Sequence, residues 1–275
     1  MKKFTLMAAF AAMAISASAQ SVVTTSGSSL NTIKNAKDVI VVSVSEAVKK
    51  AFEDAKVIKA DYSVDDVTHF LYVWDETYTG GTPSGMNSVG LAEGWVSLVV
   101  SNIGWSGAGF ASKDPGKDVS IIDDDYKLHF ALKSNDNAIH CFGVGESKMA
   151  IGASGFVDGD KGTYPVLEDF PRDGKWYNYD IPVSVLKKYI VGDKWFNEED
   201  LTKYKGNLIW WLSGGVAGTT FDIDQVFFYH GEVGTDGIQS VKAENESAAA
   251  YNLAGQKVDA NFKGIVVKNG KKYMK

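Results

Sequence analysis

Aromatic side chains next to polar ones, at the ends of alternating apolar runs, are the residues of this chain best placed to do chemistry. Within residues 69–110, the first apolar run ends at a cluster of aromatic and acidic residues: Trp74, Asp75, Glu76 and Tyr78. The second apolar run is followed by a glycine-rich stretch that holds Asn102 and Trp105. Sugars present C–H faces that stack on aromatic rings, and hydroxyls that bond to carboxylates and amides. These six residues therefore predict a carbohydrate-binding surface.

A second aromatic pair occurs in the apolar run 207–215, which reads NLIWWLSGG. Successive side chains of a strand point to opposite faces, so either Trp210 or Trp211 must face outward while the other packs inward. We include Trp211 in the predicted ligand-binding set. In the alternative interpretation the tryptophans close the end of a hydrophobic core, and the protein is a structural or adhesive surface protein without a small-molecule ligand.

Catalytic motifs are not found in the sequence. The four histidines lie in strand-like runs without zinc-ligand spacing, and GWSG at 104–107 lacks the G-x-S-x-G pattern of serine hydrolases. Acidic clusters at 75–76, 123–125 and 198–200 are typical of solvated loops. We therefore expect a binding protein rather than an enzyme, with no cofactor.

Asp222 and Asp224 are the only candidate metal ligands that we single out. They are two residues apart in a predicted strand, so their side chains share one face and suit a structural Ca²⁺ ion. The simpler alternative, a role at the edge of the sheet without metal, is the one we favour.

The elements that must position these residues are short strands separated by glycine turns. Apolar alternation predicts strands at 39–44, 57–62, 69–74, 95–101, 127–134, 138–145, 148–155, 176–182, 207–215 and 219–230. Short helices are expected at 45–54, capped by Ser45, and at 183–190, between Pro182 and Gly192. Many strands with one or two short helices predict an all-β sandwich over residues 39–230.

The composition of the chain argues against a nucleic-acid partner and against an internal disulfide. A formal net charge of −6 and a pI of about 5.3 argue against a nucleic-acid surface. The single cysteine, Cys141, cannot form an internal disulfide and lies in an apolar run, so we expect a buried thiol.

The N-terminal residues have the pattern of an export signal. Residues 1–19 combine two lysines, an apolar stretch and an Ala-Ser-Ala cleavage site, which predicts a signal peptide and a mature start at Gln20. No later stretch approaches the roughly 18 apolar residues of a membrane helix. Residues 20–38 are rich in Ser, Thr and Asn and predict a linker. We expect a secreted or cell-surface protein.

Three segments carry a family resemblance: KLHFALKS (127–134), GKWYNYDIPVSVL (174–186) and FDIDQVFFY (221–229). In this order they resemble the jelly-roll modules of the galactose-binding-like group, in which a W-x-x-y-D-I-P strand precedes a short helix and a D-x-D-x-V/I-x-F strand closes the sheet. Many members are carbohydrate-binding modules of polysaccharide-degrading enzymes, and residues 94–110 are similar to exported proteins of gut Bacteroidetes. The resemblance implies a jelly-roll sandwich and a glycan or polysaccharide ligand, but no particular site residues.

Residues 231–275 form a separate predicted unit of a linker and a few short strands. The strands 251–258 and 264–268, and the Asn269-Gly270 turn, make this tail similar to the C-terminal sorting domain of the type-nine secretion system of Bacteroidetes. That resemblance implies the secretion machinery as a partner. Ile265 and Val266 replace the usual aromatic residue and a proline-rich start is missing, so an accessory β-unit is the alternative.

Overall fold

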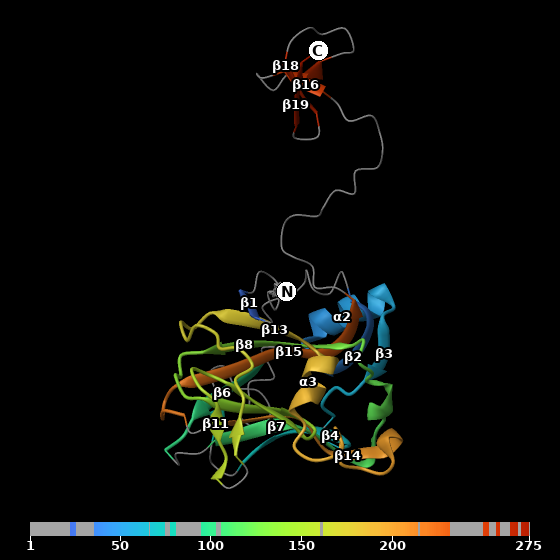
Figure 1. Cartoon of the computed structure of the whole chain (residues 1–275). Coiled ribbons are helices and arrows are strands. Elements are labelled where there is room, and N and C mark those ends of the chain that lie inside the picture. Colours follow the sequence, from blue (N-terminus) through green and yellow to red (C-terminus); the bar gives the residue numbers. More distant parts are fainter. Residues whose placement is uncertain are drawn as a thin grey trace, which may run out of the picture. The chain divides into compact units, whose positions relative to one another are not determined.

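The computed structural model describes residues 23–25, 36–65, 67–74, 78–80, 95–102, 106–159, 162–213 and 215–231, and four short strands after residue 249. The chain divides into two compact units, residues 1–234 and 235–275 (Figure 1). The described part of the first unit consists mainly of two packed β-sheets, with helix in short segments. This confirms the predicted all-β sandwich.

Sheet A is the larger layer and has eight strands. Its main path runs β1 (Val23–Thr25), β13 (Trp176–Pro182), β8 (Lys127–Ser134), β15 (Thr220–Gly231), β2 (Ala36–Ser43) and β3 (Ile58–Asp61). The first half of β15 also pairs with β6 (Val96–Val100), which pairs with β5 (Tyr78–Gly80). All of these pairings are antiparallel except β2 with β3.

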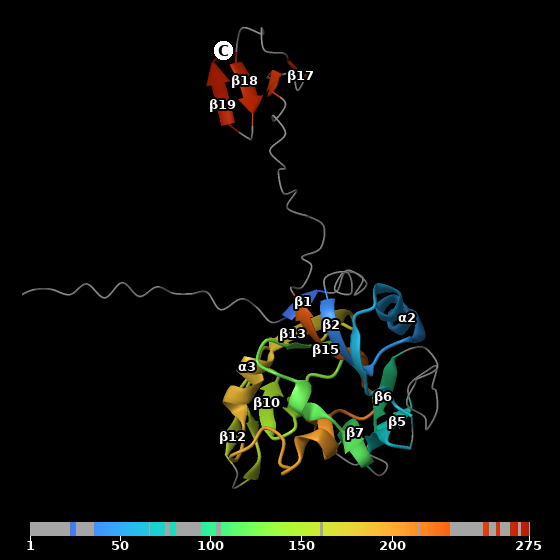
Figure 2. The same cartoon turned by 90° about the vertical axis from the view of Figure 1, so that its right-hand side faces the viewer.

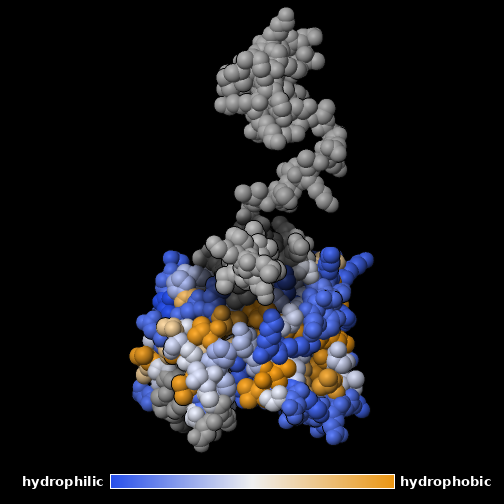
Figure 3. All heavy atoms as spheres, viewed as in Figure 1, coloured by the Kyte–Doolittle hydropathy of each residue, from blue (hydrophilic) through white to orange (hydrophobic). Residues whose placement is uncertain are grey.

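Sheet B has five strands, all antiparallel to their neighbours. Their order is β10 (Ser147–Ile151), β9 (His140–Val144), β14 (Tyr204–Ser213), β7 (Ser106–Lys117) and β4 (His69–Val73). Figure 1 shows β8, β15 and β2 in one layer and β7, β4 and β14 in the other. On the side viewed there, hydrophobic residues form several small patches between hydrophilic ones (Figure 3).

The main core lies between the two sheets and is rich in aromatic rings. Phe130 of β8 stacks on Tyr179 of β13 with ring centroids 4.9 Å apart, and it also contacts Phe142 of β9. These side chains come from alternate positions of strands in both layers, as the period of two requires. Alternation thus leaves the intervening positions of each strand for the outer faces of the sandwich.

Helix α2 (Glu46–Ala55) covers part of the outer face of sheet A, beside β2 (Figure 2). The Ser45 side chain accepts a hydrogen bond from the Val48 amide at the helix start, as predicted. Val48 and Phe52 form the buried stripe and pack in a second core with Phe227 and Tyr229 of β15.

The remaining short elements close the ends and sides of the sandwich. They are α3 (Val183–Leu186) with the 3₁₀ turn η5 (Lys187–Tyr189), the turns η3 (Val119–Ile121) and η6 (Leu201–Lys203), and the hairpin of β11 (Phe156–Val157) and β12 (Thr163–Tyr164). The hairpin packs Phe156 and Tyr164 over Cys141 and Ala150 on the outer side of sheet B. Cys141 is fully buried, as predicted.

Two sequence expectations differ from the structure. Strand β7 was not predicted, because Gly107, Gly109 and Pro115 resemble loop residues, yet it is a central strand of sheet B. Residues 20–38 were expected to be a linker, but Val23–Thr25 pairs with β13 and β2 already begins at Ala36. Within the described residues the longest helix, α2, has ten residues, and no helix has the length and apolar character needed to cross a membrane.

The second unit has a small antiparallel sheet of its own. Its strands are β16 (Ala250–Asn252), β17 (Lys257–Val258), β18 (Ile265–Lys268) and β19 (Lys271–Met274), in the order β17-β16-β18-β19. Lys268 pairs with Lys271, so β18 and β19 are adjacent antiparallel strands, and the predicted Asn269-Gly270 turn lies outside the described residues. A role of this unit in secretion stays a prediction.

Candidate functional site

The six residues of the predicted sugar surface are only partly described. Trp74 directly follows β4 of sheet B and is 49% exposed, whereas Tyr78 begins β5 of sheet A. Asn102 is exposed in a turn after β6. Asp75, Glu76, Trp105 and the Tyr78 side chain lie outside the described residues. A platform of Trp74, Tyr78 and Trp105 therefore stays a prediction, with two of its members starting from different sheets.

Trp211 is a correction to the predicted ligand set. Its side chain is 1% exposed and lies between the sheets, with ring centroids 5.7 Å from Phe142, 6.0 Å from Phe130 and 6.2 Å from Phe110. A ring enclosed in this way cannot stack on a ligand. The alternation in β14 was interpreted correctly, but it is Trp210 that faces outward.

The outer face of sheet B gathers four aromatic side chains, which we call the aromatic face: Phe70, Tyr72, Trp74 and Trp210. The first three alternate along and just after β4, so they share one side of the sheet. Trp210 joins them because Tyr72 and Trp210 both pair with Gly109 of β7, from its two sides. All four are partly or well exposed.

Glycines on the neighbouring strands let these rings lie close to the sheet. A Cβ atom added to Gly143 would lie 2.1 Å from the Trp210 indole, and one added to Gly107 would lie 2.8 Å from the Trp74 indole. The Tyr72 hydroxyl is likewise 2.8 Å from a Cβ position at Gly109. Any larger residue would push the rings away. The glycines therefore leave space for the rings to lie against the sheet, where the rings form a broad apolar surface.

Hydrogen bonding and burial characterise the two side chains in the middle of the aromatic face, Trp210 and Tyr72. The Trp210 Nε1–H donates a hydrogen bond of 3.3 Å to the Gly145 carbonyl, which orients the indole along the sheet. Burial raises the pKa of Tyr72 to about 12, so its hydroxyl is neutral and can both donate and accept hydrogen bonds at ordinary pH.

A polar cavity of about 280 Å³ adjoins Trp210. Its lining comes from the β9–β10 turn, the start of β14 and the loop before it, and combines amides, lysines and one carboxylic acid with the indole: Glu146, Lys148, Asn197, Tyr204, Lys205, Asn207 and Trp210. Most small-molecule sites are lined mainly by apolar side chains, so this polar lining suits a ligand rich in hydrogen-bonding groups. The aromatic face and this cavity form one continuous candidate site through Trp210.

The cavity was missed by sequence reasoning for a physical reason. Its polar residues occupy a turn and a loop that come together only when β10, β9 and β14 pair. The sequence nevertheless contains a signal for the aromatic face. Gly107, Gly109 and Gly143 alternate with bulkier residues, and strand positions that lie beneath large rings need small residues.

The two predicted metal ligands, Asp222 and Asp224, are engaged with protein donors on the outer face of sheet A. Asp222 accepts from Ser97 Oγ at 2.9 Å and from Lys133 Nζ at 2.9 Å. Asp224 accepts from the Gln225 amide and side chain, and burial raises its pKa to about 6. Donors occupy the oxygens that Ca²⁺ would need, which favours the metal-free alternative. Among the described residues, no group of three potential ligands has metal-binding geometry.

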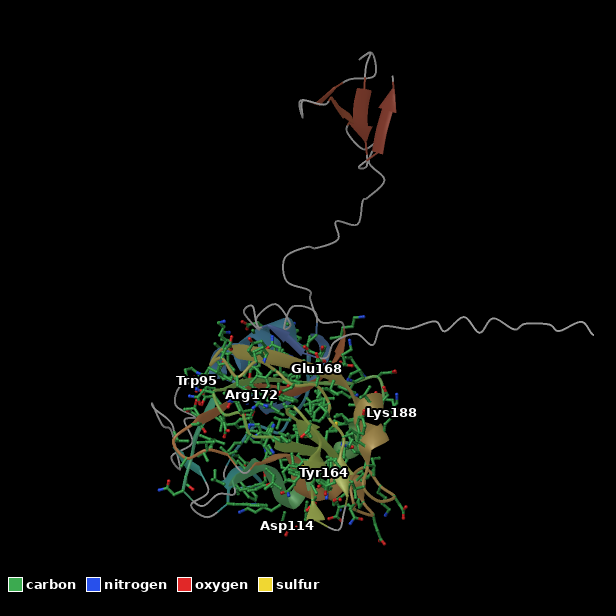
Figure 4. The ribbon with its side chains drawn as sticks, turned by 60° about the vertical axis from the view of Figure 1, so that its left-hand side comes forward. Trp95, Asp114, Tyr164, Glu168, Arg172 and Lys188 are labelled. Atoms are coloured by element: carbon green, nitrogen blue, oxygen red, sulfur yellow. The ribbon has the colours of Figure 1, made fainter. Side chains whose placement is uncertain are left out.

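Several other side chains on the described part of the outer face of sheet A contact one another. Lys133 lies over the rings of Trp95 and Trp176, at 5.5 and 4.8 Å from their centroids. Further along, Asp180 accepts from the Tyr229 hydroxyl and contacts His129 Nδ1, each at 2.8 Å. Trp95 lies on the sheet A side of the sandwich and Tyr164 on the sheet B side (Figure 4).

Comparisons with known proteins return structural likeness but no family. No protein-family model and no curated protein matches the chain. Among solved structures, the chain is similar to the family 11 carbohydrate-binding module of the cellulosomal cellulase Lic26A-Cel5E of Clostridium thermocellum, with 15% identity, a TM-score of 0.30, and coverage of 62% of this chain and 92% of that one. It is also similar to a family 30 carbohydrate-binding module, with 14% identity, a TM-score of 0.35, and coverage of 64% and 84%.

Proposed function

We propose that this protein binds carbohydrate on the aromatic face and in the adjoining cavity, without catalysing a reaction. The observation that carries the proposal is the open sheet face on which Tyr72, Trp74 and Trp210 lie over glycines. Such rings offer flat apolar surface for the C–H faces of sugars, while the amides and charged groups of the cavity suit hydroxyls.

The dimensions of the face favour a chain of linked sugars over a single one. Tyr72 and Trp210 belong to strands two positions apart in sheet B, so their backbones lie roughly 10 Å apart at the usual strand spacing. The face continues beyond Tyr72 to Trp74 and beyond Trp210 into the cavity. A surface of this length is larger than one sugar ring, so we propose a polysaccharide or oligosaccharide ligand.

The cavity also favours binding over hydrolysis. A glycosidase needs two carboxylic acids roughly 5–10 Å apart across the bound sugar. Among the described residues that line the cavity, Glu146 is the single carboxylic acid. The proposed role is therefore recognition alone.

Affinity electrophoresis in gels containing soluble plant or host polysaccharides tests the proposal. Stacking of one ring on a sugar contributes about 1–2 kcal/mol, so Trp210→Ala should weaken retardation roughly tenfold. The matched control is Trp176→Ala, which removes a half-buried tryptophan from the outer face of sheet A and should leave retardation unchanged.

The opposite result would contradict the proposal: if Trp176→Ala abolishes retardation and Trp210→Ala does not change it, the ligand binds to sheet A. If the wild-type protein binds no polysaccharide in the panel, the structural or adhesive alternative takes the place of this proposal.

We propose further that the protein is exported, because residues 1–19 have the composition of a signal peptide. Intact-mass measurement on protein from its native host should find Gln20 as the first residue. A retained Met1 would contradict export by this route. Secreted chains that end between residues 231 and 237 would support recognition of the tail by a secretion machinery, whereas full-length secreted chains would favour an accessory unit.

A further inference from the structure

We propose that the site selects acidic polysaccharides, and that the Lys148 ammonium binds the carboxylate of a uronic acid at the rim of the cavity. This inference rests on the proposed carbohydrate-binding function and specifies its ligand class. Lys148 is then a specificity-determining residue of the site.

Lys148 is positioned by the same cross-strand row that builds the aromatic face. It pairs with Gly143 of β9, and Gly143 pairs with Trp210 of β14, so the three side-chain positions follow one another across sheet B. Because Gly143 has no side chain, the lysine and the indole meet above it, with Nζ 5.9 Å from the Trp210 ring centroid. The Tyr164 ring flanks Nζ on another side, at 5.7 Å.

The ammonium of Lys148 is held by rings but is not neutralised. Among the described residues no carboxylate forms an ion pair with it, whereas two of the other lysines that lie over rings have such partners: Lys133 pairs with Asp222 and Lys187 pairs with Asp124. Cation–π contacts orient an ammonium and leave its N–H donors available. In a chain with a net charge of −6, such a cation beside an aromatic surface indicates an anionic ligand group.

The other charges around the cavity are consistent with this assignment. Lys205 is paired with Asp114, and Asp158 accepts a hydrogen bond from the Tyr164 hydroxyl. Glu146 is the remaining carboxylate of the lining, and it can accept hydrogen bonds from sugar hydroxyls. A sugar ring stacked on Trp210 would therefore meet a positive group at Lys148 and an acceptor at Glu146, which suits a ring that carries both a carboxylate and hydroxyls.

The test compares an acidic polysaccharide with its own neutral form. Polygalacturonate and carboxyl-reduced polygalacturonate differ only in the carboxylate, so the ratio of their affinities isolates the contribution of that group. At low salt the full-length protein should bind the acidic form about fivefold more tightly, which is the size of a partly exposed ion pair, and added salt should reduce the ratio.

Three variants locate the effect. Lys148→Gln should bring the ratio close to one and leave binding of the neutral form unchanged, and Lys148→Arg should restore the ratio. The matched control is Lys59→Gln, which removes a lysine that lies over the Tyr126 ring away from the aromatic face and should leave the ratio at its wild-type value. Melting curves of all variants verify that they are folded.

Equal binding of both forms by the wild type, or a ratio that persists in Lys148→Gln, would overturn the inference while the proposed function stands. Binding of neither form, together with no retardation by any polysaccharide in the wider panel, would instead overturn the proposed function. If Lys148→Gln does not fold, a lost or retained preference in Lys148→Met or Lys148→Ala decides the inference in the same way.

Discussion

Strand alternation builds both outer faces of this sandwich, but the two faces differ in how far other parts of the protein cover them. On sheet A, helix α2 covers Phe227 and Tyr229, and the exposed part of the face is tied together by pairs such as Lys133 with Asp222. On sheet B, aromatic rings lie over glycines, and among the described residues the hairpin β11–β12 covers the part around Cys141, with Trp210 packed against that cluster. In the described part of the chain, packing and pairing close much of one face, and the other is left open.

The difference between the two faces arises from the residues that neighbour each aromatic side chain. On sheet A, Phe227 lies beside His129 at 4.7 Å between ring centroids and beneath Phe52 of the helix, so its surface is used inside the protein. On sheet B, Trp210 lies beside Gly143, and nothing on the glycine covers the indole from above. Glycine next to an aromatic residue therefore lets the ring lie flat on the sheet, whereas bulky neighbours enclose the ring.

The largest expected effect is on stability. Phe227→Ala removes a fully buried ring between α2 and sheet A and should lower the free energy of unfolding by about 3–5 kcal/mol. Thermal melts should show a fall of roughly 10 °C for a unit of this size. Trp210→Ala, on the open face, should change the melting temperature by only a few degrees. Equal losses in the two variants would remove the distinction between the faces.

The next effect is on binding and acts through a glycine. Gly143→Ala places a methyl group in the space of the Trp210 indole and should displace the ring, weakening polysaccharide retardation by about tenfold. A double-mutant cycle supplies the control, because Gly143→Ala should have no further effect in a Trp210→Ala background. An undiminished effect in that background would show that the glycine acts on something other than the ring.

An effect of similar size in free energy concerns pH and belongs to the closed face. Burial raises the pKa of Asp224 from 3.8 to about 6, opposed by hydrogen bonds from Gln225 and by the nearby His129. The folded state therefore holds this proton more tightly than the unfolded chain does. The stabilisation is complete below pH 3.8 and is lost as the pH rises through about 6.

Asp224→Asn removes this titration. The stability of the wild type relative to the variant should fall by on the order of 2 kcal/mol between pH 4 and pH 7, measured by urea unfolding at each pH. The other titrating groups are common to both proteins and cancel in the difference. A constant difference across this range would show that Asp224 does not titrate as its burial indicates.

The smallest expected effect concerns the reactivity of Cys141, at the edge of the open face. Cys141 lies beneath the hairpin β11–β12, and burial raises the pKa of its thiol to about 12. Alkylation at pH 8 should therefore be negligible in the folded protein and complete in denaturant. Rapid alkylation of the folded protein would mean that the hairpin does not close this end of sheet B.

Much of the fold was predictable because strand periodicity survives in the sequence. The predicted strand 176–182 and the Ser45-capped helix match β13 and α2 closely. Strand β7 was hidden by Gly107 and Gly109, which in isolation indicate a loop, although a central strand under large rings requires such residues.

The site was only half predictable. Trp74, one of the predicted ligand residues, is exposed, but local pattern could not decide which of Trp210 and Trp211 faces outward. That choice depends on the register of β14 against β7 and β9, where Trp210 meets glycines and Trp211 meets the core. The cavity depends on a turn and a loop distant in sequence, and only the folded sheet brings them together.

The most direct test of the open face is NMR chemical-shift mapping. The ¹⁵N-labelled protein would be titrated with oligosaccharides cut from whichever polysaccharide retards it most strongly. We expect the perturbed amides to cluster on β4, β7, β9 and β14, with the indole N–H of Trp210 among the largest shifts. Perturbations concentrated on β8, β13 and β15 of sheet A would contradict the assignment of the binding surface to sheet B.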